Sequence, residues 1–211
     1  MNRNVAEAAR RQPRETPKAG SKTAKESFRA RLIVVSGPSG AGKISVAQRL
    51  LADPRFARAL TATTRKPRPG EKDGVDYRFL TPESFERRLA EGRFLEHARV
   101  YGSLYGTPRE APKAVLASGR HCLLVIDVQG AGTLRRMGVE AHYVFVQAPG
   151  EGELKRRLED RGLDGPKDVE RRLKAAKDEM RQAGDFDLVL VNETVEETAR
   201  RLAASVGVDL R

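Results

Sequence analysis

Apolar residues along this chain gather in short runs that alternate with segments of helical periodicity. The runs cover 32–35, 122–126, 143–146 and 188–191, the length of buried strands. The helical segments cover 45–52, 83–91, 109–118, 152–160, 168–182 and 195–204. Strands that alternate with helices are typical of a parallel sheet covered on both faces. We therefore predict an α/β fold.

Two stretches interrupt this alternation. The stretch 62–106 is rich in Gly, Pro, Thr, Arg and Tyr, and we predict an inserted subdomain of short antiparallel strands there. Within it, Thr81 followed by Pro82 predicts the start of a helix, with Thr81 as its cap. The stretch 161–166 lies between two helical segments and is flanked by arginines, which indicates a mobile lid.

The distribution of charge sets the first 30 residues apart from the rest of the chain. The 211 residues carry a net charge of +11, and about half of the excess falls in residues 1–30. This segment has almost no large apolar side chains, so we predict a disordered extension. The alternative is a weak contact of the tail with nucleic acid or another anionic surface, which we regard as the poorer interpretation.

The remaining composition limits where the protein acts. No apolar run approaches the roughly 18–20 residues that span a membrane, so no membrane partner is expected. The single cysteine, Cys122, falls in an apolar run, which predicts a buried thiol in a reducing, cytoplasmic compartment. His97, His121 and His142 show no metal-ligand spacing and are predicted to be structural. No oligomeric state follows from the sequence.

The clearest chemical motif is the segment 37–43, GPSGAGK, between a predicted strand and a predicted helix. Such a turn lets backbone N–H groups surround a phosphate at the helix N-terminus, and Lys43 would reach the outer phosphates. The next position normally carries a hydroxyl that binds Mg²⁺, but here it is Ile44. The loop therefore predicts a nucleotide-binding site that lacks the usual side-chain ligand for Mg²⁺.

Six further segments of the sequence match the motifs of one known family. They are 63–71 (TTRKPRPGE), 74–77 (GVDY), 94–96 (FLE), 105–107 (YGT), 126–130 (IDVQG) and 157–162 (RLEDRG). In this order and spacing, residues 31 to 206 resemble the guanylate kinase family. The resemblance implies transfer of the γ-phosphoryl group of ATP to GMP or dGMP, with Mg²⁺. It also implies a phosphate-loop α/β fold.

The resemblance further implies a division of the chain. After the tail, residues 31–211 would form one kinase-like domain. Its core would comprise 31–60, 108–154 and 173–211. A GMP-binding subdomain would cover about 61–107, and a lid about 155–172.

The resemblance implies an acceptor site for GMP. Two arginines three apart suit a phosphate dianion, because guanidinium groups bind phosphate oxygens in pairs. Two carboxylates would accept hydrogen bonds from guanine N1–H and the exocyclic amine, a pair of donors that adenine lacks. The implied residues are Thr61, Arg65, Arg68, Tyr77, Glu96, Tyr105, Thr107 and Asp127.

The donor site for ATP follows in the same way. Its implied residues are Gly37, Pro38, Ser39, Gly40, Ala41, Gly42, Lys43, Ser45 and Asn192, the last near adenine. The implied catalytic residues, which place positive charge at the transferring phosphates, are Lys43, Arg157, Arg161 and Arg172. The adjacent Arg156 and Arg171 are predicted to be solvated.

Two positions depart from the family, both where Mg²⁺ is handled. Ile44 replaces the loop hydroxyl, and Val125 stands where the family usually has Glu or Asp. Ser45 is no simple substitute, because one residue along a helix turns about 100°. We therefore predict no metal-binding residue and a Mg²⁺ held mainly by ATP phosphates and water. The alternative is a protein that binds GMP and ATP but transfers phosphate poorly or not at all.

Overall fold

The fold is seen in a computed structural model that describes residues 29–160 and 165–210. The predicted tail up to residue 28, the predicted lid residue Arg161 and the last residue lie outside this description. Among the described residues, no helix is both long and apolar enough to cross a membrane.

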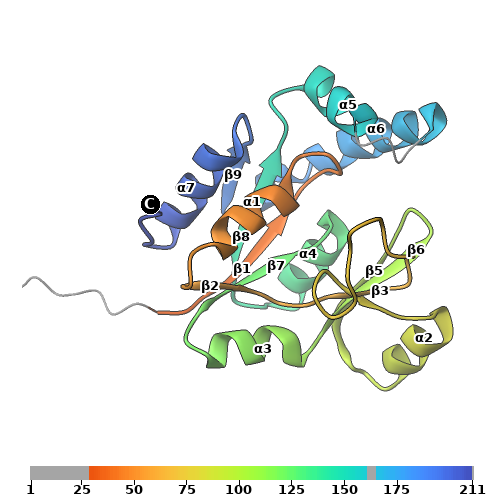
Figure 1. The fold of residues 1–211 in the computed structure, drawn as a ribbon, viewed down its shortest axis with the longest axis vertical. Helices are drawn as coiled ribbons and strands as arrows, with labels where there is room; N and C mark the ends of the chain where they lie inside the picture. The colour runs from red at the N-terminus through yellow and green to blue at the C-terminus, as the bar shows by residue number, and fades with distance from the viewer. Residues whose placement is uncertain (1–28, 161–164, 211) are drawn as a thin grey trace, which may run out of the picture.

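A five-stranded parallel sheet forms the centre of the molecule (Figure 1). Its order is β2-β7-β1-β8-β9, and every neighbouring pair is parallel. The strands are β1 (Leu32–Ser36), β2 (Phe56–Arg58), β7 (His121–Val125), β8 (His142–Gln147) and β9 (Leu188–Val191). The runs that predicted strands are confirmed, whereas the three-residue β2 gave no apolar signal of its own.

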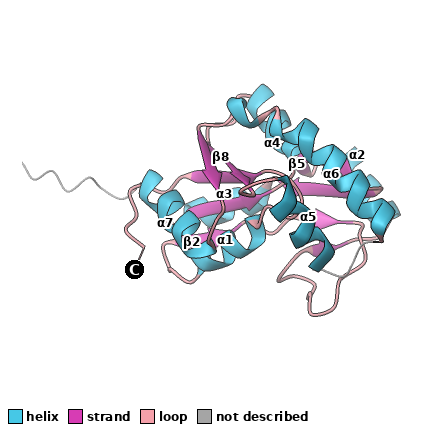
Figure 2. Ribbon diagram, turned by 90° about the horizontal axis from the view of Figure 1, so that it is seen from above, coloured by secondary structure: helices cyan, strands magenta, loops and turns pink. Residues whose placement is uncertain are grey.

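Helices cover both faces of this sheet, as the view in Figure 2 shows. On one face α1 (Lys43–Leu51) and α7 (Val195–Ser205) bury residues such as Leu50 and Leu202 against the sheet. On the other face lie α3 (Glu110–Ala117) and α4 (Val128–Arg136), which buries Leu134. Helix α4 was not predicted, because Gly130 and Gly132 dilute its helical signal.

A second, smaller sheet lies beside the first, with the order β4-β3-β6-β5. Its strands are β3 (Ala62–Thr63), β4 (Arg78–Phe79), β5 (Phe94–Val100) and β6 (Ser103–Pro108). The pairs β3–β6 and β5–β6 are antiparallel as predicted, but β3–β4 is parallel. The expectation of antiparallel strands alone is therefore wrong, because residues 64–77 return to the start of β3 before β4 begins.

The small sheet has a core of its own. Helix α2 (Pro82–Ala90) buries Phe85, whose ring stacks on that of Phe94 at 4.4 Å between centroids. The predicted helix start is confirmed, since the Thr81 side chain accepts a hydrogen bond from the Ser84 N–H. This core lets the small sheet keep its shape at one side of the cleft described below.

Helices α5 (Glu151–Asp160) and α6 (Pro166–Met180) pack on each other above the central sheet (Figure 1). Their contact buries Leu154, Leu158, Val169 and Ala176. A short 3-10 turn, η1 (Ala183–Asp185), then leads into β9. The two helices carry the arginines that the sequence assigns to catalysis and that lie among the described residues.

Truncating Leu202 to Ala should lower the free energy of unfolding by about 2–5 kcal/mol, because its side chain is fully buried between α7 and the sheet. The control is Met137→Ala at the end of α4, where the side chain is half exposed, with a change of less than about 0.5 kcal/mol. Urea denaturation measures both. Equal losses in the two variants would contradict the packing described here.

Candidate functional site

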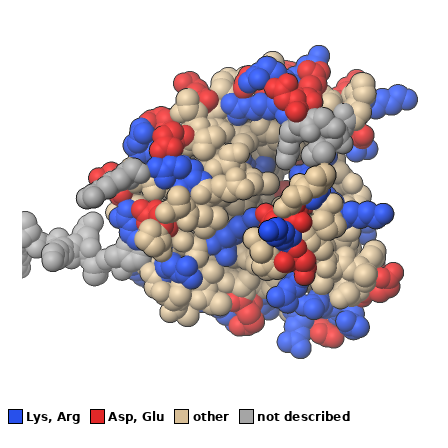
Figure 3. Space-filling view, viewed as in Figure 1, with Lys and Arg blue, Asp and Glu red and all other residues tan. Residues whose placement is uncertain are grey.

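A cleft of about 590 Å³ opens at the carboxyl ends of β1 and β7, where ligands of parallel α/β sheets bind. Its other walls come from the small sheet and from α5 and α6. In Figure 3 the surface is hollowed between these two parts, and Lys and Arg atoms border the hollow. The cleft therefore lies between the central sheet, the small sheet and the α5–α6 pair.

The phosphate-binding loop follows β1 directly and requires glycine at both ends. Gly37 has φ 131°, and a Cβ there would lie 2.1 Å from the carbonyl oxygen of Val146. Gly42 has φ 92° and precedes the first turn of α1. The Lys43 ammonium donates to the carbonyls of Gly37 at 2.5 Å and Pro38 at 2.8 Å. The loop thus wraps around Lys43 and leaves backbone N–H groups at the N-terminus of α1.

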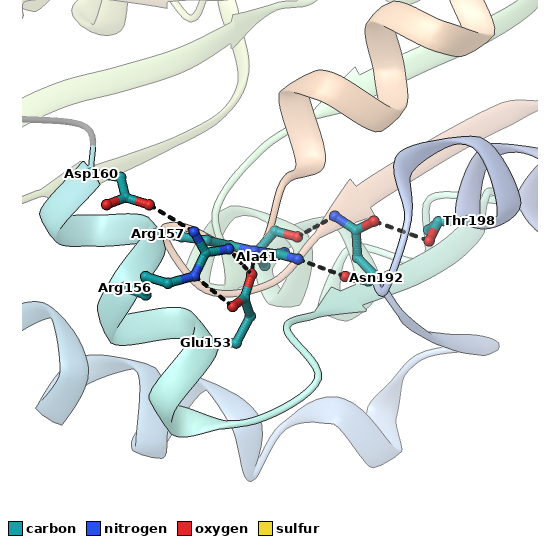
Figure 4. A network of polar contacts seen from close by, with 7 residues as sticks. All are labelled: Ala41, Glu153, Arg156, Arg157, Asp160, Asn192 and Thr198. Atoms are coloured by element: carbon teal, nitrogen blue, oxygen red, sulfur yellow. Dashed lines mark hydrogen bonds and ion pairs between the residues drawn. The ribbon is translucent and has the colours of Figure 1, made fainter.

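Asn192 holds this loop from behind (Figure 4). Its side chain is 1% exposed, donates to the Ala41 carbonyl at 2.8 Å and accepts from the Thr198 hydroxyl at 3.1 Å. A Cβ on Gly42 would lie 2.1 Å from the Asn192 amide nitrogen. The loop can therefore approach β9 this closely only with glycine at position 42.

Arg157 reaches the same point from α5 (Figure 4). It donates to the Asn192 carbonyl oxygen at 3.0 Å and to Glu153 at 2.7 Å. Arg156 also donates hydrogen bonds to Glu153 and to Asp160, which lies one helical turn further along α5. These hydrogen bonds, first from Arg156 and then from Arg157, lower the pKa of Glu153 to about 2. Glu153 therefore stays ionised and fixes Arg157 beside the loop.

Arg172 comes from α6 and contacts the loop at Ser39. Its guanidinium donates to the Ser39 hydroxyl at 2.9 Å and lies 4.5 Å from the ring centre of Tyr101. Tyr101 sits in the β5–β6 turn with φ 48°, a left-handed conformation that is uncommon outside glycine. Arg172 therefore joins α6, the loop and the small sheet at one edge of the cleft.

The basic turn after β3, residues 64–71, contributes to the wall of the cleft on the side of the small sheet. Arg65 donates to the Tyr105 hydroxyl at 3.2 Å and to Glu71 at 2.9 Å, and the Arg68 N–H donates to the other oxygen of Glu71 at 2.7 Å. Burial alone would raise the pKa of Glu71, but the hydrogen bonds from Arg65 and Arg68 lower it. Arg65, Arg68, Tyr77 and Tyr105 all line the cleft. Their side chains offer donors that suit a phosphate.

Glu96 lies deeper in the cleft and is 4% exposed. It accepts a hydrogen bond of 2.5 Å from the Thr107 hydroxyl. Burial raises the pKa of Glu96 to about 7; the charge of Asp127 adds to this and the bond from Thr107 opposes it. A Cβ at Gly130 would lie 2.7 Å from Glu96 Oε2, so the α4 glycine leaves room for the carboxylate.

Asp127 and Thr61 complete this end. One carboxylate oxygen of Asp127 caps α4 by accepting from the N–H groups of Gln129 and Gly130, at 2.8 and 3.2 Å. Thr61 is 3% exposed and lines the cleft, and within the described residues its buried hydroxyl has no hydrogen-bond partner. An orphaned hydroxyl in the same cleft as two carboxylates suits a ligand with both donors and acceptors.

The remaining cleft wall is where Mg²⁺ would be expected. Ile44 and Val125 both line it and offer no ligand atom, while Ser45 and Glu179 line it with oxygens. Burial raises the pKa of Glu179, and the charge of Lys43 opposes that rise. In the described parts of the chain, no group of three or more His, Cys, Asp or Glu could hold a metal ion. This donor set fits a Mg²⁺ that keeps most of its water.

Most residues predicted for the site thus line one cleft. Three of them instead support residues that line it. The carbonyls of Pro38 and Ala41 accept hydrogen bonds from Lys43 and from Asn192. The Thr107 hydroxyl donates to Glu96. The sequence missed Glu153, Tyr101 and Glu179, which also line the cleft. Spacing on one helix could have paired Glu153 with Arg157, whereas Tyr101 and Glu179 gave no local signal.

Arg156 and Arg171, predicted to be solvated, are more than half exposed. Arg156 nevertheless lines the cleft, and Arg171 lies 5.7 Å from the ring centre of Tyr101. His121, His142 and Cys122 agree with their predicted structural roles, since the His142 ring bonds the Ser205 hydroxyl at 3.0 Å. His121 accepts from the Arg31 N–H, and Cys122 is a buried free thiol.

Comparison with known proteins gives one consistent family. A family model described as guanylate kinase matches residues 29–207. The guanylate kinase of Streptomyces kasugaensis is 47% identical, with 83% of this chain and 86% of that protein covered. That of Rubrobacter xylanophilus is 48% identical, with 80% and 88% covered. A crystal structure of guanylate kinase from Anaplasma phagocytophilum superposes with a TM-score of 0.69 at 35% identity, covering 85% of each chain.

Replacing Glu96 with Gln should flatten part of the pH dependence of stability. Because the pKa of Glu96 is raised from 4.5 to about 7, the folded protein holds this proton more tightly than the unfolded chain. The resulting stabilisation is complete below pH 4.5 and lost as the pH rises through 7. Wild type should therefore lose roughly 3 kcal/mol relative to Glu96→Gln between pH 4.5 and 8.

Urea unfolding at several pH values measures this difference. The exposed Glu86→Gln variant controls for the removal of one carboxylate. Parallel stability profiles for wild type and Glu96→Gln would show that Glu96 does not carry the raised pKa.

Proposed function

This chain belongs to the guanylate kinase family, and from that premise we propose how its cleft transfers a phosphoryl group between two nucleotides. The protein is a guanylate kinase, which forms ADP and GDP from ATP and GMP. The observation that carries the proposed residue roles is the presence of the phosphate-binding loop and the Glu96–Asp127 end in one cleft.

The acceptor base is proposed to bind at the deep end of the cleft. The carboxylates of Glu96 and Asp127 accept from guanine N1–H and the exocyclic amine, and the Thr61 hydroxyl satisfies a further polar atom of the base. Thr107 orients Glu96 through its hydroxyl. Adenine lacks this pair of adjacent donors, so the same carboxylates would face an unpaired acceptor and reject it. Guanine selectivity then follows from polar groups that only guanine satisfies.

The acceptor phosphate is proposed to bind at the basic turn. Arg65 and Arg68 contribute guanidinium groups, and Tyr77 and Tyr105 contribute phenolic hydroxyls. Support comes from the Glu71 carboxylate, which already positions Arg65 and the backbone of residue 68. A phosphate held at this turn would point toward the phosphate-binding loop across the same cleft. Nothing in this arrangement demands a 2′-hydroxyl, so dGMP is proposed as a second acceptor.

The donor, ATP, is proposed to place its phosphates on the loop 37–43 and Ser45. Lys43 would exchange its loop carbonyls for the outer phosphates. Arg157, Arg172 and the undescribed Arg161 would compensate the charge that develops on the transferring group. Asn192 supports the loop through Ala41 and lies at the end proposed for adenine. No covalent intermediate is needed, because positioning and charge carry the reaction.

Mg²⁺ is proposed to bind mainly through ATP phosphates and water, and Ser45, Asp127 and Glu179, which line the cleft, would accept hydrogen bonds from that water. When bound, it neutralises phosphate charge and orients the transferring group. Ile44 and Val125 exclude water from this wall without adding a ligand. This arrangement makes the affinity for Mg²⁺ depend on the nucleotide more than on the protein.

The remaining assignments follow from this scheme. We propose a core, a GMP-binding subdomain of about residues 61–107 and a lid of about 155–172, which close over the substrates and exclude water. We also propose a cytoplasmic location, on the ground of the buried, unpaired thiol of Cys122.

ADP formation should be fastest with GMP when GMP, dGMP, AMP, UMP and CMP are compared as acceptors. The expected kcat/KM for AMP is lower than that for GMP by about 10⁴-fold, since the buried carboxylates would be left unpaired. A coupled assay of ADP formation measures all five. A preference for any base other than guanine would overturn the proposed base contacts.

Ile44→Ser and Val125→Glu should lower the Mg²⁺ concentration needed for half-maximal activity by about tenfold, because each adds an oxygen near the metal. The KM for GMP should stay unchanged, since neither position is among the proposed GMP contacts. Magnesium titrations at saturating ATP measure the shift. Because Val125 is buried, Ile44→Ser alone remains decisive if the second variant fails to fold. An unchanged Mg²⁺ dependence of Ile44→Ser would show that position 44 does not face the metal.

A further inference from the structure

Arg58 is a partly buried cation without an assigned role. It ends β2, the edge strand of the central sheet, and lies outside the cleft lining. Its Nε and Nη2 atoms are shielded from solvent and, among the described residues, have no hydrogen-bond partner. Its guanidinium carbon lies 5.3 Å from the centre of the Tyr77 ring. The side chain therefore spans from the central sheet to the segment just before β4.

This placement costs stability. A buried donor left without an acceptor loses its water and gains no protein partner. Contact of the guanidinium with an aromatic face does not supply the missing hydrogen-bond acceptors. An apolar side chain of similar length would fill the same space without that cost. Stability alone therefore does not explain an arginine at position 58.

The ring that Arg58 covers belongs to the phosphate end of the cleft. Arg65 lies 5.4 Å from the centre of the same Tyr77 ring, and Tyr105 stands edge-on to it at 6.1 Å. Phe79 follows at 5.8 Å. Tyr77 is thus enclosed by two guanidinium groups and two rings, and Arg58 is the member of this set that comes from the central sheet. A change at Arg58 would reach the cleft through Tyr77.

We propose that Arg58 is a positioning residue for GMP: by covering the Tyr77 ring it fixes the phenolic hydroxyl toward the acceptor phosphate. This inference rests on the proposed role of Tyr77 in binding that phosphate. The geometry gives Arg58 two effects on Tyr77. It restricts the ring's rotation against β2, and its positive charge strengthens the hydroxyl as a donor.

The electrostatic effect has the right direction. Burial raises the pKa of Tyr77, and the charge of Arg58 is the largest influence that opposes this rise. A cation near the ring favours partial negative charge on the phenolic oxygen, which polarises its O–H bond. The proton is then shared more readily with a phosphate oxygen.

The test compares Arg58→Met with Arg78→Met, which removes the same charge from an exposed position on β4. Arg58→Met should raise the KM for GMP about 3- to 10-fold with kcat unchanged, because it weakens binding alone. The inhibition constant of guanosine, which lacks the phosphate, should not change. The Tm should stay the same or rise, since an unsatisfied buried group is removed. Arg78→Met should leave all four quantities at wild-type values, and Arg58→Lys should retain part of the affinity.

A double-mutant cycle with Tyr77→Phe decides the mechanism. If Arg58 acts through the Tyr77 hydroxyl, Arg58→Met should have no further effect on the KM for GMP in the Tyr77→Phe background. An undiminished effect there, or no effect in wild type, would overturn the inference while leaving the proposed role of Tyr77 intact. An unchanged KM for GMP in Tyr77→Phe itself would instead overturn the proposed phosphate site, and the inference with it.

Discussion

The buried hydrogen bond from Asn192 to the Ala41 carbonyl is the contact on which the working shape of this molecule depends. It holds the middle of the phosphate-binding loop against the end of β9, and the absence of a side chain at Gly42 allows that approach. Thr198 of α7 orients the amide from the other side, while the backbone of Asn192 receives Arg157. The loop, the sheet edge and helix α5 are therefore fixed by one residue.

A different constraint governs the end of the cleft at which we propose that guanine binds. There the protein keeps the carboxylate of Glu96 away from water and close to the charge of Asp127, which makes Glu96 costly to ionise. Thr107 offers one hydrogen bond, which leaves the second carboxylate oxygen over Gly130. Binding energy from guanine donors can then offset a cost already present in the free enzyme. The proposed selectivity for guanine and the raised pKa of Glu96 then have the same origin, which is the burial of this carboxylate.

The sequence predicted the parts of this structure that depend on local patterns. Apolar runs identified the long strands of the central sheet, and glycine spacing identified the phosphate-binding loop. It failed where long-range contacts decide the outcome. Helix α4 forms because Asp127 caps it and Leu134 packs on the sheet, although its glycines weaken the helical signal. Arg58 and Tyr101 matter only through neighbours distant in sequence, so no local pattern could reveal them.

The placement of the tyrosines has an optical consequence. The chain contains four tyrosines and no tryptophan, so its intrinsic fluorescence comes from tyrosine alone. Tyr77, Tyr101 and Tyr105 line the cleft, and only Tyr143 lies in the core of the central sheet. Three of its four natural fluorophores therefore lie in the walls of the cleft in which we propose that the nucleotides bind. Tyrosine emission can therefore report on ligand binding in that cleft without any attached dye.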